Sequence, residues 1–135
     1  MRLVITSDTH GMLQQAELPA GDVLIICGDA LPNKFPTPQT DAFYQLNELR
    51  VLDEFCGRLN FKHTLLIAGN HDWCFQEKPA EARARLTHAV YLQDSGCEIE
   101  GLTFYGSPWR IWPTCAVSGP HDGRSRSRRP VDTTS

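Results

Sequence analysis

The stretch Val23-Leu24-Ile25-Ile26-Cys27-Gly28-Asp29 decides the fold that we predict for this chain. Its aliphatic run is typical of a strand that is buried on both faces, as the strands of parallel sheets are. The run ends at a glycine, and an aspartate follows at once. Because open α/β sheets carry their sites at the carboxyl ends of the strands, the stretch predicts a buried strand over residues 22–27 that places Asp29 in a site.

Two further aliphatic runs repeat this arrangement. Leu-Val-Ile at residues 3–5 lies in a predicted strand over residues 2–7, and Leu-Leu-Ile-Ala at residues 65–68 lies in one over residues 63–68. The polar residues that follow them are Asp8, His10, Asn70, His71 and Asp72. Since parallel strands end at one edge of a sheet, we expect these side chains to lie near Asp29.

The segments between and after these strands complete the predicted fold. Apolar residues recur at helical spacing over residues 40–59, and Pro79 is a suitable first residue for a helix that runs to about residue 88. A short strand is expected at residues 90–92, and a hairpin is expected over residues 97–105. Strands separated by helices and followed by a hairpin predict an α/β fold with a mixed sheet and flanking helices.

Composition and charge restrict the class of protein. The 135 residues predict one globular domain, with 41% hydrophobic and 21% charged residues. A net charge of −3 argues against nucleic acid or an anionic membrane as a partner. The sequence begins with no signal peptide and has no apolar stretch of the roughly 20 residues that span a bilayer. The five cysteines form no C-x-x-C pair and are expected to be reduced, so we predict a cytoplasmic protein.

The composition changes after Trp112. Ser, Thr, Pro and Gly fill 12 of the 23 positions in residues 113–135, and Val117 and Val131 are the two aliphatic residues there besides alanine. Such a segment cannot bury enough apolar surface to offset the entropy of ordering it. We therefore predict a domain over residues 1–112 and a disordered tail, rich in Arg, Ser and Pro, over residues 113–135.

The polar residues at the three strand ends suit a metal centre. Asp8 and His10 are alternate residues, so both side chains can reach one cation if the strand continues that far. Asp29 has two carboxylate oxygens and can bridge two cations, and Asn70 offers a neutral amide oxygen. Two cations about 3.5–4 Å apart lower the pKa of a bridging water towards ~7 and hold a phosphate in line with it. The pattern therefore indicates metal-dependent hydrolysis of phosphate esters.

His71 and Asp72 have roles beside such a centre. His71, next to a bound phosphate, could protonate the leaving alkoxide, which is a general-acid contribution of roughly 10²–10⁴ in rate. Asp72 could orient that imidazole, as carboxylates near metal sites commonly do.

These blocks carry a specific resemblance to a known family. The chain resembles the calcineurin-like metallophosphoesterase superfamily in the order and spacing of three blocks. These blocks are D-x-H at residues 8–10, G-D at residues 28–29 and G-N-H-D at residues 69–72. Three further stretches resemble the branch that includes the mammalian brain metallophosphodiesterases: residues 21–25, 91–95 and 105–109.

The resemblance covers residues 1–112 and implies both a fold and a site. The family fold is a two-sheet α/β sandwich flanked by helices, of which this chain would form an incomplete version. The implied metal ligands are Asp8, His10, Asp29 and Asn70, and the implied catalytic residues are His71 and Asp72. The implied cofactors are two divalent ions, expected to be Mn²⁺ with Fe, Zn or Mg²⁺ as alternatives. The implied substrates are small phosphomonoesters or phosphodiesters, cyclic nucleotides among them.

One departure from the family pattern leaves alternatives open. The later G-H and G-H-x-H blocks, which complete both metal sites in the family, are absent from this sequence. The chain is therefore either a phosphoesterase that uses hydroxide activated by two metals, or an inactive truncated or frame-shifted relative that binds at most one metal weakly. The second alternative predicts an exposed apolar sheet face that an oligomer would cover. The third alternative is an interaction module that uses the arginine-rich tail.

Overall fold

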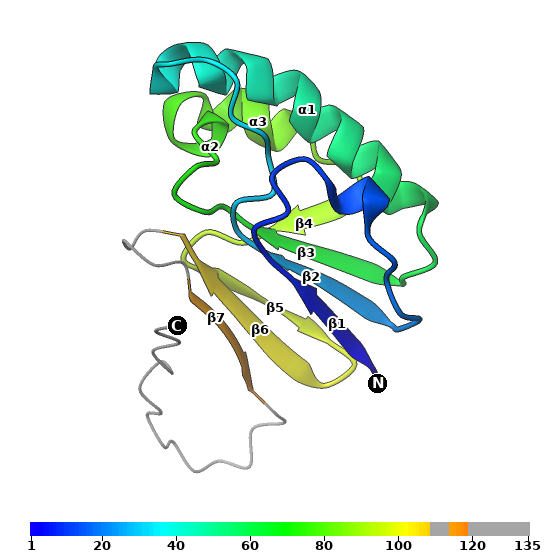
Figure 1. Cartoon of the computed structure of the whole chain (residues 1–135). Helices are drawn as coiled ribbons and strands as arrows, with labels where there is room; N and C mark the ends of the chain where they lie inside the picture. The colour runs from blue at the N-terminus through cyan, green and yellow to red at the C-terminus, as the bar shows by residue number, and fades with distance from the viewer. Residues whose placement is uncertain (109–113, 119–135) are drawn as a thin grey trace.

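The computed structural model describes residues 1–108 and the strand at residues 114–118, and it has three layers (Figure 1). The helices α1 (Pro38–Arg58), α2 (Cys74–Glu77) and α3 (Pro79–Ala84) cover one face of a parallel sheet, and a second sheet packs against the other face. None of the helices in the described part of the chain has the length and apolar character needed to cross a membrane. The α/β class and the flanking helices that the sequence predicts are confirmed.

The parallel sheet has four strands in the order β1-β2-β3-β4. Their bounds are Leu3–Thr6, Val23–Cys27, His63–Ile67 and Ala89–Tyr91, and a short 3-10 helix, η1 (Leu13–Gln15), lies between the first two. The register aligns Ile5 with Ile25 and Ile25 with Leu65, so the first three strands end at one edge. The four aliphatic residues of β2 are at most 1% exposed, which confirms a central strand buried on both faces.

The second sheet is antiparallel and has the order β5-β6-β7. The strand bounds are Ser95–Ile99, Leu102–Ser107 and Thr114–Ser118. The strands therefore form two sheets and not the one mixed sheet that the sequence led us to expect. The hairpin stacks on the parallel sheet because its alternating pattern buries Ile99 and Phe104 against Ile25 and Leu65. This is the two-sheet sandwich that the family resemblance implies.

Strand β7 corrects part of the prediction of a disordered tail over residues 113–135. Residues 114–118 pair antiparallel with β6, with Thr114 opposite Ser107. This segment contains few aliphatic residues, but a strand that is added to an existing edge gains main-chain hydrogen bonds that composition does not reveal. The rest of the predicted tail, residue 113 and residues 119–135, lies outside the described residues.

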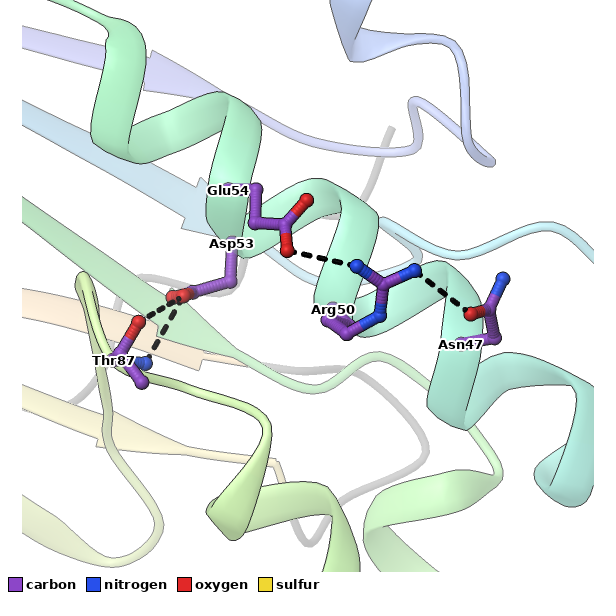
Figure 2. A network of polar contacts seen from close by, with 5 residues as sticks. All are labelled: Asn47, Arg50, Asp53, Glu54 and Thr87. Carbon is purple, nitrogen blue, oxygen red and sulfur yellow. Dashed lines mark hydrogen bonds and ion pairs between the residues drawn. The ribbon is translucent and has the colours of Figure 1, made fainter.

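Helix α3 ends at Ala84, four residues before the predicted end. The loop that follows is instead held by Asp53 of α1, whose carboxylate accepts hydrogen bonds from the Thr87 N–H at 3.0 Å and the Ala89 N–H at 2.9 Å. Figure 2 shows this side chain reaching from the helix to Thr87. A buried carboxylate therefore holds the segment that leads into β4.

Helix α1 begins two residues before the predicted start, because Thr37 caps it. The Thr37 hydroxyl accepts a hydrogen bond from the Thr40 N–H at 3.3 Å, and Pro38 occupies the first helical position. This long helix covers the parallel sheet with an apolar stripe that includes Leu46 and Leu49.

Thr37→Ala is expected to lower the free energy of unfolding by about 1 kcal/mol, because the first turn of α1 loses its side-chain acceptor. Urea denaturation measures this loss. Thr37→Ser keeps the hydroxyl and should stay close to the wild type. Equal unfolding midpoints for the two variants would contradict the capping role.

Candidate metal centre

Three strand ends converge to build the site. The loops after β1 and β2 run side by side: the Asp8 N–H donates to the Gly28 carbonyl at 3.0 Å, and the His10 N–H donates to the Asp29 carbonyl at 2.9 Å. From the loop after β3, the His71 N–H donates to Asp29 Oδ1 at 2.9 Å. Hydrogen bonds of the main chain therefore fix the loops that carry the predicted residues.

The backbone is strained at three of these residues. Asp8, His10 and Asp29 have left-handed conformations, with φ of 56°, 45° and 51°. This region costs a residue other than glycine roughly 1–2 kcal/mol. Within the described chain, the other non-glycine residues that adopt it are Asp94 and Glu100. Because such strain gathers at functional sites, its concentration here marks this edge of the sheet as the candidate site.

The side chains of the same three residues form a donor set for one metal ion. A carboxylate oxygen of Asp8, a ring nitrogen of His10 and a carboxylate oxygen of Asp29 all lie within 4.8 Å of one another. Asp8 and His10 are exposed, whereas Asp29 is 8% exposed. Imidazole suits Zn and Fe, and carboxylate suits Mn and Mg, so the mixed set accepts several of these ions. The residues present therefore fit a divalent metal ion.

The loop after β3 brings two more predicted residues to this edge. The rings of His71 and His10 meet edge-to-face with their centroids 6.1 Å apart, so His71 lies beside the donor set. Asn70, the residue before it, is exposed and lines a hollow of about 270 Å³ together with Trp73 and Tyr91. A ligand held by the donor set is thus within reach of the His71 ring.

Asp72 also lines this hollow, but its side chain is almost fully buried beneath the edge. It is 3% exposed, and its carboxylate accepts hydrogen bonds from the Gly69 N–H at 2.8 Å and the Leu31 N–H at 3.1 Å. Burial raises the pKa of Asp72 to about 6, against the opposing effect of these donors. Within the described residues its hydrogen bonds go to the main chain. Asp72 therefore ties the loops after β2 and β3 together, and this replaces the expectation that it orients the His71 imidazole.

Two residues that support the site escape sequence reasoning. The side-chain amides of Gln45 and Asn33 both donate to the His71 carbonyl, at 2.8 and 3.0 Å. The sequence offers one indication that Gln45 has a special role: it is a polar residue on the apolar stripe of the predicted helix, four positions before Leu49. Asn33 lies in a proline-rich loop and gives none.

Comparison with known proteins identifies the family. The family model of the calcineurin-like phosphoesterases matches residues 1–129. The chain belongs to this family. The match extends past residue 112, where the resemblance ended, and it confirms the family that the three polar blocks indicate. Calcineurin-like phosphoesterases typically bind divalent metals, in keeping with the donor set at the sheet edge.

The curated relatives that the chain matches are much longer than the chain itself. The proteins named Metallophosphoesterase domain-containing protein 1 in Homo sapiens and in Mus musculus are each 30% identical to it in an alignment 134 positions long. That alignment covers 82% of the chain and 38% of the relative. A UPF0046 protein of Caenorhabditis elegans is 32% identical in an alignment 123 positions long, which covers 81% of the chain and 39% of the relative. The chain therefore spans about two fifths of the length of these relatives.

Proposed function

We propose that the chain is a metal-dependent phosphoesterase that hydrolyses small phosphomonoesters or phosphodiesters. The observation that carries this proposal is the donor set of Asp8, His10 and Asp29, whose ligand atoms lie within 4.8 Å of one another. Membership of the calcineurin-like phosphoesterases supports the reaction class. In this proposal the donor set holds one divalent ion, and Asn70 and Asp29 contribute to a second.

The chemistry divides between the ions and the chain. Divalent ions bound here would supply an activated water and neutralise charge on the phosphate. Asp29 uses Oδ1 to hold the His71 N–H, and its other oxygen makes no hydrogen bond within the described part of the chain, so it is free to be a ligand. The exposed His71 imidazole holds a proton at a ring nitrogen and donates it to the leaving alkoxide. Asp72 keeps the two loops in register from below.

Asp29→Asn is expected to weaken Mn²⁺ binding by about 100-fold or more. Even the loss of a residue that only hydrogen-bonds a metal ligand typically weakens metal binding 10–100-fold, and Asp29 is assigned as a ligand itself. The variant keeps the shape of the side chain and an oxygen for the His71 N–H, so the charge is what is lost. Titration calorimetry measures the affinity. Asp22→Asn is the matched control, because Asp22 precedes the same strand at its opposite end and accepts the Arg2 N–H at 2.7 Å. Unchanged binding in Asp29→Asn would contradict the assigned ligand.

Hydrolysis tests the reaction itself. p-Nitrophenyl phosphate and bis(p-nitrophenyl) phosphate separate monoesterase from diesterase activity, with Mn²⁺ added to metal-free protein. We expect Mn²⁺-dependent turnover of at least one of them by the wild type and by Asp22→Asn, and its loss in Asp29→Asn. A folded wild type that turns over neither substrate would eliminate the hydrolase.

A second candidate function is an inactive relative that binds one ion weakly. The observation in its favour is that the described residues hold one group of three metal-ligating His, Cys, Asp or Glu side chains. Calorimetry separates the two candidates. Two Mn²⁺ sites that both depend on Asp29 favour the phosphoesterase, whereas one weak site favours the inactive relative.

A further inference from the structure

The carbonyl oxygen of His71 is the meeting point of two side-chain amides from elsewhere in the chain. Gln45 Nε2, on helix α1, donates to it at 2.8 Å and also to the Pro32 carbonyl at 3.2 Å. Asn33 Nδ2 donates to it at 3.0 Å. Because a carbonyl oxygen has two lone pairs, these two donors saturate it. The peptide group after His71 is therefore fixed to α1 and to the loop that precedes it.

Gln45 is held at both ends of its amide. The residue is 0% exposed, and Oε1 accepts the Cys74 N–H at 3.1 Å while Nε2 donates to the His71 carbonyl. A buried amide without partners is costly, so the orientation of this side chain is determined by its partners. Residues 71–74 are thereby held in one register against α1.

Asn33 is oriented by Asp41. Asn33 Nδ2 donates to Asp41 Oδ2 at 2.6 Å, while Asp41 Oδ1 accepts the N–H groups of Lys34 and Phe35 at 2.8 and 3.1 Å. Asp41 is 2% exposed. Because an ionised carboxylate only accepts hydrogen bonds, it requires Asn33 to present its NH₂ group, and the second hydrogen of that group goes to His71.

We propose that Gln45 and Asn33 are positioning residues for His71. On the other side of the residue, the His71 N–H donates to Asp29 Oδ1 at 2.9 Å, so both peptide groups of His71 are fixed. The imidazole then has only its own two torsions to adjust, and it lies edge-on to His10 with ring centroids 6.1 Å apart. The inference rests on the proposed function, in which His71 donates a proton to the leaving group, and it adds that α1 and the loop before it aim this donor.

Kinetics give the first test. In Asn33→Ala and Gln45→Met, kcat for the better p-nitrophenyl substrate should fall about 10- to 100-fold, since small displacements of a reacting group cost this much, while KM and Mn²⁺ affinity change little. A role in stability alone would leave kcat of the folded protein unchanged. Asn33 is exposed, so its variant is expected to fold even if the buried Gln45→Met does not. Asn47→Ala is the matched control, because Asn47 lies on the same helix and bonds the exposed Arg50 side chain at 3.1 Å (Figure 2).

A proton NMR measurement without metal gives the second test. The edge-to-face rings of His10 and His71 should produce a nuclear Overhauser cross-peak between their ring protons in the wild type and in Asn47→Ala. We expect this cross-peak to weaken or vanish in Asn33→Ala and Gln45→Met, because the His71 main chain is released.

The two tests keep this inference separate from the proposed function. In one outcome, the wild type neither binds Mn²⁺ nor hydrolyses the substrates, while the cross-peak disappears in Asn33→Ala. That outcome would overturn the proposed phosphoesterase activity and support the positioning role. A cross-peak that persists in both variants, with kcat unchanged where turnover is measured, would overturn the positioning role and leave the phosphoesterase untouched.

Discussion

Gly69→Ala is expected to abolish Mn²⁺ binding and to lower the free energy of unfolding by about 3 kcal/mol or more. An alanine Cβ at this position would overlap the main-chain nitrogen and Oδ1 of Asp29 and lie 2.8 Å from its Cγ. Asp29 is buried and already strained at φ 51°, so it cannot yield without moving the loop after β2. Overpacking typically costs 1–3 kcal/mol. Here the added Cβ clashes with the main chain of Asp29 and with the carboxylate that we assign to the metal.

Gly101→Ala is the matched control for this substitution. Gly101 lies in the turn between β5 and β6 with φ of 80°, and an added Cβ there would meet nothing within 4 Å. Its replacement costs only backbone strain, about 1–2 kcal/mol, and Mn²⁺ affinity should match the wild type. Urea denaturation and Mn²⁺ calorimetry on both variants measure the two effects. Wild-type Mn²⁺ affinity in Gly69→Ala would refute the placement of the metal against Asp29.

The positions of the donor residues could be predicted because they depend on short-range sequence. An aliphatic run that ends in Gly28-Asp29 specifies a buried parallel strand and puts the aspartate at its carboxyl end, and the same reasoning places His10 and Asn70. The parallel register then brings the strand ends to one edge, as expected. The fold class and the residues at this edge were therefore within reach of the sequence.

The partners of each side chain could not be predicted, because they come from distant parts of the chain. Asp72 follows His71 directly, yet its carboxylate bonds the main chain of Leu31, 41 residues away. Gln45 reaches His71 across 26 residues. From the sequence, the hairpin around Gly101 could equally have extended the edge of the parallel sheet. In the structure, Phe104 packs on the face of that sheet, so the hairpin forms a second layer. Such choices depend on tertiary contacts, which local patterns do not encode.

Asp53→Ala is expected to cost about 3 kcal/mol of stability, the largest effect that we predict away from the metal centre. Asp53 is 2% exposed, and its carboxylate accepts hydrogen bonds from the Thr87 N–H and, at 2.8 Å, from the Thr87 hydroxyl (Figure 2). It also accepts hydrogen bonds from the N–H groups of His88 and Ala89. Each hydrogen bond to a charged group contributes roughly 1.5–3 kcal/mol. Thr87 and His88 are exposed, so in the variant water can replace part of the hydrogen bonds that their N–H groups lose. The expected loss of stability is therefore well below the summed contributions of the individual hydrogen bonds.

Glu54→Ala provides the control at the next residue of the helix. Glu54 pairs with Arg50 at 2.8 Å, and both side chains are about half exposed. Exposed pairs at this spacing contribute roughly 0.3–0.5 kcal/mol, so the urea midpoint of Glu54→Ala should stay close to the wild type. Alanine is a better helix former than either residue, so a similar loss in both variants would show that the contact with the loop is not what Asp53 specifically provides.

The pH dependence separates the charge of Asp53 from its shape. Burial raises the pKa of Asp53, but the N–H donors of Ala89, Thr87 and His88 together outweigh burial, and the pKa lies below the ordinary 3.8. A carboxyl whose pKa is lower in the folded chain contributes its full stability above the unfolded value and loses it as pH falls through the folded value. The difference in unfolding free energy between wild type and Asp53→Ala should therefore be the same at pH 7 and pH 5 and shrink below about pH 4. Urea unfolding at these pH values measures it, and a difference that persists undiminished at pH 2 would mean that packing of the side chain, and not its charge, holds the loop before β4.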